Sequence, residues 1–185
     1  FIREATLDEV NDWYEDLRPT DPQIPERDLS ITEILPLDDI SFDMSSALGA
    51  KCANVSTMRT FGFPEGTIPD GYGVPFYFYD EFMQYNDFYE EAEVMITNPS
   101  FIYDIDFRED RLRDFRDDIK DAPMPPWMMD ALQEMHDSFP VGTPVRCRSS
   151  TNNEDLPGFS GAGLYTSKTQ YPEEGHISKS IKQVY

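Results

Sequence analysis

VRCRSSTNNEDLPGFSGAGLY, residues 145–165, combines strand-forming and loop-forming residues in one short segment. It begins with two arginines in an apolar-flanked segment that favours a β-strand, and residues 164–166 predict a second short strand. The residues between them are mostly hydroxyl, amide and glycine residues, a composition typical of a loop. The stretch therefore predicts two strands and a connecting loop that can hold an anion.

The chemistry of this loop suits a phosphate group. Glycines allow left-handed backbone that approaches a ligand closely, and free N–H groups in such a loop form an anion-binding nest. Hydroxyls add donors, and a guanidinium matches the geometry of a phosphate. An ordinary Gly-Ser turn is the alternative interpretation. The residues concerned are Arg148, Ser149, Ser150, Thr151, Gly158, Gly161 and Gly163.

Two sequence blocks resemble the nucleotide-binding half of pyruvate phosphate dikinase, phosphoenolpyruvate synthase and the glucan water dikinases. One block is RSSTNNEDLPG at 148–158, followed by GAGLY at 161–165. The other is LGAKCAN at 48–54, followed by GFP at 62–64 and IPDGYGVP at 68–75. Both occur in the order of that family and together span roughly residues 35–185, so the resemblance covers most of the chain.

The resemblance implies an ATP site and names its residues. Lys51 and Arg148 would clamp the phosphates electrostatically, although an isolated lysine is usually a solvated surface residue. A phosphate-covering loop would comprise Ser149, Ser150, Gly161, Ala162 and Gly163. This chain has Ala50 where the family usually has glycine, which affects the expected backbone geometry beside Lys51.

The resemblance also implies an architecture. We expect an α+β fold resembling the first part of an ATP-grasp nucleotide site, with a small mixed sheet covered by helices. Residues 1–28 would form a helix and a proline-rich linker, and residues 29–185 the N-terminal part of the ATP-binding domain. The adenine-binding segment and the acidic Mg²⁺ ligands are expected outside this chain, with Glu154 and Asp155 ordering the loop instead of binding metal.

In such a parent protein, ATP phosphorylates a histidine on a separate domain, and the phosphate passes to pyruvate, water or a glucan. The expected partners are therefore ATP, the remaining half of the ATP-grasp site and the phosphohistidine domain, and the isolated chain is expected to be inactive. A second hypothesis is a noncatalytic acidic interaction module that keeps the scaffold.

The charge of the chain limits its partners. It has 15 basic and 36 acidic side chains, a net charge of −21, yet residues 145–185 carry five basic and four acidic side chains, a net charge of +1. Like charge opposes association with nucleic acids and anionic membranes, so neither is an expected partner. The near-neutral C-terminal segment coincides with the predicted anion loop.

The cysteines and histidines indicate no metal or catalytic site. Cys52 and Cys147 lack metal-binding spacing and are expected to be buried free thiols in a cytoplasmic protein. The family resemblance implies in addition that both flank the ligand site. His136 is expected to be structural, and His176 to cap or begin the last helix. Neither histidine lies in a phosphohistidine-like motif.

Hydrophobic periodicity predicts six helices and two further extended segments. The first helix has a capping box formed by Thr6 and Glu9. Inward-facing residues expected for the second helix are Leu48, Cys52, Val55 and Met58. The helices are predicted at about residues 6–17, 46–61, 80–95, 109–122, 127–139 and 178–185, an extended arm at 31–37 and a strand at 74–78.

Overall fold

The computed structural model describes residues 2–17, 24–153, 161 and 163–185. Its helices are α1 (Leu7–Leu17), α2 (Ser45–Leu48), α3 (Ala50–Arg59), α4 (Phe76–Tyr85), α5 (Phe88–Thr97), α6 (Pro99–Tyr103), α7 (Ile105–Asp121), α8 (Pro126–Asp137) and α9 (Ser178–Lys182). Short 3₁₀ turns lie at Leu37–Asp39, Phe42–Met44 and Pro172–Glu174. The strands are β1 (Leu35–Pro36), β2 (Tyr72–Gly73), β3 (Val145–Arg148) and β4 (Ser167–Gln170).

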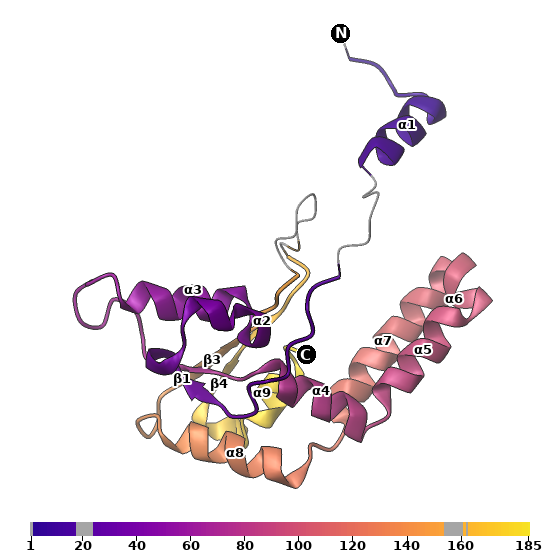
Figure 1. Cartoon of the computed structure of the whole chain (residues 1–185). Coiled ribbons are helices and arrows are strands. Elements are labelled where there is room, and N and C mark those ends of the chain that lie inside the picture. The colour runs from indigo at the N-terminus through magenta and orange to yellow at the C-terminus, as the bar shows by residue number, and fades with distance from the viewer. Residues whose placement is uncertain (1, 18–23, 154–160, 162) are drawn as a thin grey trace.

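The fold is α+β, as expected from the sequence. The strands of the described residues form two separate antiparallel pairs, β1 with β2 and β3 with β4. The prediction of a small mixed sheet is therefore corrected to two antiparallel pairs of strands. The likeness to an ATP-grasp site stays a prediction. Figure 1 shows α2 and α3 on one side of these strands and α8 and α9 on the other.

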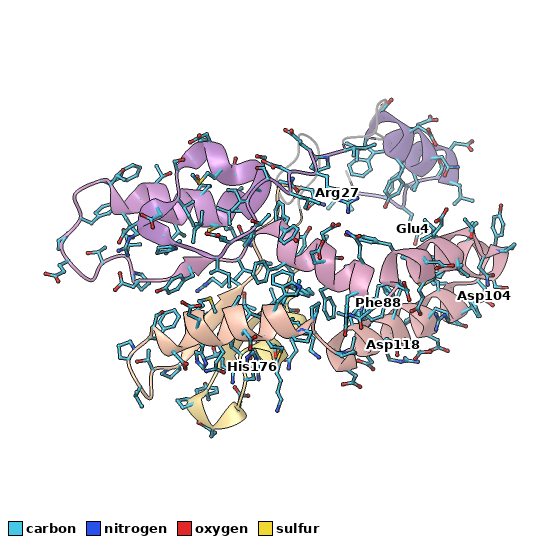
Figure 2. The ribbon with its side chains drawn as sticks, turned by 60° about the horizontal axis from the view of Figure 1, so that its bottom comes forward. Glu4, Arg27, Phe88, Asp104, Asp118 and His176 are labelled. Carbon is cyan, nitrogen blue, oxygen red and sulfur yellow. The ribbon has the colours of Figure 1, made fainter. Side chains whose placement is uncertain are left out.

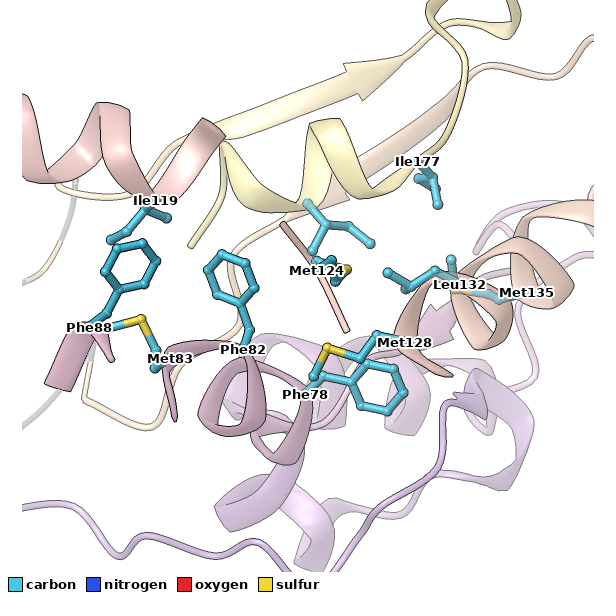
Figure 3. Close-up of a cluster of buried hydrophobic side chains, with 11 residues drawn as sticks. Phe78, Phe82, Met83, Phe88, Ile119, Met124, Met128, Leu132, Met135 and Ile177 are labelled. Carbon is cyan, nitrogen blue, oxygen red and sulfur yellow. The ribbon is translucent and has the colours of Figure 1, made fainter. Parts of the chain in front are cut away.

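The main core joins α4, α8 and α9 (Figure 3). Phe78 and Phe82 are one helical turn apart on α4, and both are fully buried. They pack in the same cluster as Met128 and Leu132 of α8 and Ile177 beside α9. Burying a large apolar side chain contributes about 1.5–3 kcal/mol, so this cluster is the main source of stability in the domain body.

Two helical features extend from the domain body (Figure 1). Helices α5, α6 and α7 form an arm, with Phe88 at its base and the N-cap of α7, Asp104, at its outer end (Figure 2). Helix α1 lies apart from the body, and all its residues are exposed. Its predicted capping box is confirmed, because the N–H of Thr6 donates to Glu9 Oε2 (2.9 Å) and the N–H of Glu9 donates to Thr6 Oγ1 (3.3 Å).

The prediction for residues 74–95 is wrong at its beginning and in its middle. The expected strand at 74–78 is absent: β2 already ends at Gly73, and α4 begins at Phe76 with Pro75 in the N-cap position. The expected helix at 80–95 is two helices, which separate at Asp87 with φ +57°. A left-handed residue cannot continue an α-helix, so α5 begins in a new direction.

Two further boundaries differ from expectation. The helix predicted at 46–61 breaks at Gly49, and its buried side chains after the break are Ala53 and Ser56, while Val55 and Met58 are exposed. The second strand of the predicted loop region is β4, which begins after the expected residues 164–166. Helices α7, α8 and α9 lie within a few residues of their predicted positions.

Candidate functional site

Gly49 joins the two sequence blocks in space. It has φ +83°, and a Cβ atom at this position would overlap the backbone carbonyl of Ser150. Only glycine combines this backbone conformation with such a close approach. The break between α2 and α3 is therefore the place where the segment after β3 packs against the start of α3.

Three hydrogen bonds fasten this contact, which we call the Gly49–Ser150 junction. Ser150 Oγ donates to the carbonyl of Leu48 (2.8 Å) and accepts from the N–H of Cys52 (2.9 Å). The N–H of Ala50 donates to the carbonyl of Thr151 (3.0 Å). Two otherwise unpaired N–H groups at the start of α3 are thereby satisfied, and the end of β3 is fixed beside Lys51.

The junction brings the two predicted phosphate clamps to neighbouring segments. Lys51 is exposed in the first turn of α3, and Arg148 is exposed at the last position of β3. The N-terminal end of a helix carries partial positive charge, to which Lys51 adds a full one. In a chain of net charge −21 this local concentration of positive charge favours an anion.

The hairpin of β3 and β4 determines where Arg148 points. Its register pairs Arg146 with Thr169 and Arg148 with Ser167. Val145 and Cys147 lie on the opposite side and pack against the main core. Because side chains alternate along a strand, both arginines face away from that core.

The predicted loop residues differ in what they offer a ligand. Ser149 is buried, and the hydroxyl of Ser150 is already used in the junction. Gly161 is buried, and Gly163 has φ +84° with open space where a Cβ atom would lie. Sequence reasoning gave no role to Gly49, although a glycine between two helical segments is a signal for such a break. Ala162, Glu154, Asp155 and Gly158 lie outside the described residues.

The cysteines and histidines have structural environments. Cys52 and Cys147 are free thiols, as expected, but they are half-buried and not fully buried. Partial burial raises the pKa of both to about 11, so both remain protonated near neutral pH. Nδ1 of His176 accepts the N–H of Ser178 (3.1 Å), and its Nε2 lies 3.1 Å from the carbonyl oxygen of Met129. His176 thus caps the start of α9, as one sequence interpretation expected.

The segment 26–28, here called the clasp, connects the N-terminal part of the chain to this site. Arg27 forms an ion pair with Asp80 of α4, and Figure 2 shows Arg27 beside that helix. The side-chain amide of Asn152 donates to the carbonyl of Glu26 (2.8 Å), and Ser46 Oγ donates to Asp28 (2.6 Å). From the sequence, residues 1–28 were predicted to be a helix and a proline-rich linker, and these contacts were not foreseen. The predicted domain boundary at residue 28 stays a prediction.

Other concave or acidic features do not coincide with the junction. One surface pocket is lined by residues of α5 and α7 and another by residues of α4 and α8, and neither contains Lys51 or Arg148. Within residues 2–17, 24–153, 161 and 163–185, no group of three His, Cys, Asp or Glu side chains is placed to hold a metal ion. No helix of the described chain is both long and apolar enough to cross a membrane.

Comparison with known proteins gives one match. The family described as pyruvate phosphate dikinase, AMP/ATP-binding domain, matches residues 45–185, which is more than half of the chain. No curated protein and no solved structure matched. The matched range includes α2, α3, the Gly49–Ser150 junction and both strands of the β3–β4 hairpin.

Proposed function

Because the chain belongs to the pyruvate phosphate dikinase AMP/ATP-binding domain family, we propose that it binds the phosphate groups of ATP between Lys51 and Arg148. The observation that carries the proposal is the Gly49–Ser150 junction, which holds the start of α3 against the end of β3. The two cations come from segments about a hundred residues apart, yet three hydrogen bonds join those segments.

Each predicted site residue has a role in this proposal. Lys51 supplies a point charge and Arg148 a planar guanidinium that can bind two phosphate oxygens. Ser150 holds the two segments together through its hydroxyl. Ser149, the next residue after Arg148, is buried and anchors the end of β3. Gly161, Ala162 and Gly163 supply the backbone that covers the phosphates.

The parent reaction is proposed as dikinase-type phosphoryl transfer, from ATP to a histidine on another domain and then to pyruvate, water or a glucan. Such a reaction depends on positioning and on neutralising the developing charge of the phosphoryl group, which the two cations would provide. The described residues offer no fitting Mg²⁺ cluster, so no step is assigned to a metal here. The inactivity of the isolated chain and its cytoplasmic location stay predictions.

Calorimetric titration of the chain with ATP tests the proposal. We expect Arg148→Gln and Lys51→Met each to weaken ATP binding by about 10- to 100-fold, because a hydrogen bond to a charged group contributes about 1.5–3 kcal/mol. Arg113→Gln is the matched control, since Arg113 lies on the arm and pairs with Asp110.

The control variant should bind ATP like the unmodified chain. Equal affinities of all four proteins would refute the assignment of the clamps. A chain that is folded by circular dichroism and binds neither ATP nor ADP would refute ATP binding by this chain on its own, the result that the alternative, a noncatalytic acidic interaction module, also predicts.

A further inference from the structure

The outward face of the β3–β4 hairpin carries two arginines. Arg146 and Arg148 are two residues apart on β3, and their cross-strand neighbours are Thr169 and Ser167. Both arginines are exposed, whereas Val145 and Cys147 pack inward. We call this outward surface, made by Arg146, Arg148, Ser167 and Thr169, the two-arginine face.

No carboxylate neutralises this face within the part of the chain that the structure describes. Neither strand contains an acidic residue. Arg3, Arg27, Arg59, Arg111 and Arg113 all form ion pairs with carboxylates, but neither Arg146 nor Arg148 does so with a described residue. Lys168 of β4 pairs with Glu174 (3.1 Å) and belongs to the other side of the hairpin.

Arg146 is held in position by a neutral hydrogen-bond partner, which does not neutralise its positive charge. Its Nη1 donates to Thr169 Oγ1 (2.9 Å), a neutral partner on the adjacent strand. This bond uses one of the five N–H donors of the guanidinium, and the hydroxyl leaves the positive charge unchanged. Arg146 is therefore oriented along the same face as Arg148.

The spacing of the two arginines fits a ligand with more than one phosphoryl group. Residues two apart on a strand are separated by about 7 Å, and side chains as long as arginine can converge on neighbouring anionic groups. Two like charges at this spacing repel each other, and a polyanion placed between them relieves that repulsion. A single phosphate ion can be held by one guanidinium and does not require the second.

We propose that the two-arginine face binds a polyphosphate chain, with Arg148 on one phosphoryl group and Arg146 on the next. The inference rests on the proposed role of Arg148 and adds a second arginine to that site. It assigns Arg146 to ligand binding and makes the triphosphate, not the nucleoside, the part of the ligand that this face recognises.

The test compares inorganic tripolyphosphate with inorganic orthophosphate, titrated into the full chain at constant ionic strength. We expect the unmodified chain to bind tripolyphosphate at least tenfold more tightly. Arg146→Gln should weaken tripolyphosphate binding about fivefold, the effect of about 1 kcal/mol, and leave orthophosphate binding unchanged. Arg113→Gln removes the same charge from the arm and should change neither affinity.

A second variant separates ligand binding from a structural role of Arg146. Arg146→Lys keeps the charge and should bind tripolyphosphate more tightly than Arg146→Gln, although less tightly than the unmodified chain because lysine lacks the planar fork. The proposal is overturned if Arg146→Lys is as weak as Arg146→Gln, or if Arg146→Gln behaves like Arg113→Gln. It is also overturned if the unmodified chain has no preference for tripolyphosphate.

These outcomes differ from a failure of the ATP site. If Arg148→Gln weakens ATP binding while Arg146→Gln leaves tripolyphosphate binding unaffected, the ATP proposal stands and the two-arginine face is wrong. If Arg146→Gln selectively weakens tripolyphosphate binding while Lys51→Met and Arg148→Gln leave ATP binding unchanged, the ATP clamps are wrong, and the pairing of Arg148 with Arg146 on one polyphosphate is wrong with them.

Discussion

At the scale of single residues, Gly49 and Gly142 share the same φ, +83°, but have different surroundings. A Cβ atom on Gly49 would overlap the backbone of Ser150, whereas one on Gly142 would meet nothing within 4 Å. Replacing Gly142 by alanine introduces only the strain of left-handed backbone, whereas replacing Gly49 also disrupts a close contact. Comparing the two variants therefore separates these two contributions to stability.

We expect Gly49→Ala to lower the free energy of unfolding by about 3 kcal/mol or more. Left-handed strain accounts for about 1–2 kcal/mol, and forcing the Gly49–Ser150 junction apart adds a cost of similar size. Urea denaturation followed by circular dichroism measures the difference. Gly142→Ala should cost only the strain, and an equal loss in both variants would mean that the junction contributes nothing to stability.

The two thiols should react slowly and with a marked pH dependence. With pKa values of about 11, Cys52 and Cys147 are almost entirely protonated at pH 7, and the thiolate is the reactive form. Labelling by a disulfide reagent should accelerate about tenfold per pH unit from 7 to 10 in the folded chain. In urea the same thiols should reach half of their maximum rate near pH 9, and a folded chain with that profile would contradict the assigned burial.

The same pKa shift gives the sign of a stability change. The folded pKa lies above the model-peptide value of 9.0, so the folded state keeps its protons to higher pH than the unfolded state. The contribution to stability is complete below pH 9 and is lost as the pH rises toward 11. Cys52→Ser and Cys147→Ser together should reduce this alkaline loss, as measured by urea denaturation at pH 8 and pH 10.

At the scale of elements, one of the three contacts of the clasp is made to a buried carboxylate. Asp80 of α4 is only 4% exposed at its side chain and accepts from Arg27, Gln84 and Tyr89. The guanidinium of Arg27 also lies over the ring of Tyr89, 5.5 Å from its centroid. Burial and the adjacent Asp80 charge both raise the pKa of Tyr89 above its ordinary value.

We expect Asp80→Ala to lower the free energy of unfolding by about 2–4 kcal/mol, because it removes the shared acceptor of three donors and leaves a cavity in α4. Urea denaturation measures the loss. Asp110→Ala on the arm breaks the exposed pair with Arg113 and should cost less than about 1 kcal/mol. A similar cost for both variants would show that the clasp is no stronger than a surface ion pair.

Sequence patterns predicted elements well where one helix face is buried continuously. Helix α8 is an example, with Met128, Leu132 and Met135 buried at helical spacing. The failure at residues 74–78 has a physical reason, because a short run of aromatic residues after Pro75 fits either a strand or a helix. Phe78 and Phe82, one turn apart, decide for the helix only once their burial is known.

The candidate site was predictable in part. Its charged residues and glycines could be named from the resemblance, but the engagement of the Ser150 hydroxyl depends on a contact across about a hundred residues. Arg146 carried no motif signal. Its place on the same face as Arg148 follows from the alternation of side chains along β3, whereas its contact with Thr169 depends on the register of β3 with β4. Such pairings are tertiary facts that local pattern does not contain.

At the scale of the whole molecule, charge is divided unevenly. Residues 1–144 carry ten basic and 32 acidic side chains, a net charge of −22, and the rest of the chain is close to neutral. The arm adds to this excess, since α7 alternates acids and arginines in exposed pairs that contribute little individually. Self-repulsion of this kind destabilises the compact state and is screened by salt.

The melting temperature should therefore rise as sodium chloride increases from about 10 mM to about 500 mM at pH 7, because the Debye length falls from about 30 Å to a few ångströms. The control is the same series near pH 4.2, the sequence isoelectric point, where net charge and hence net repulsion are small. There, salt should leave the melting temperature unchanged or lower it by screening attractive pairs such as Arg59 with Asp38. Differential scanning calorimetry measures both series, and an equal rise at both pH values would point to a general salting effect in place of relieved repulsion.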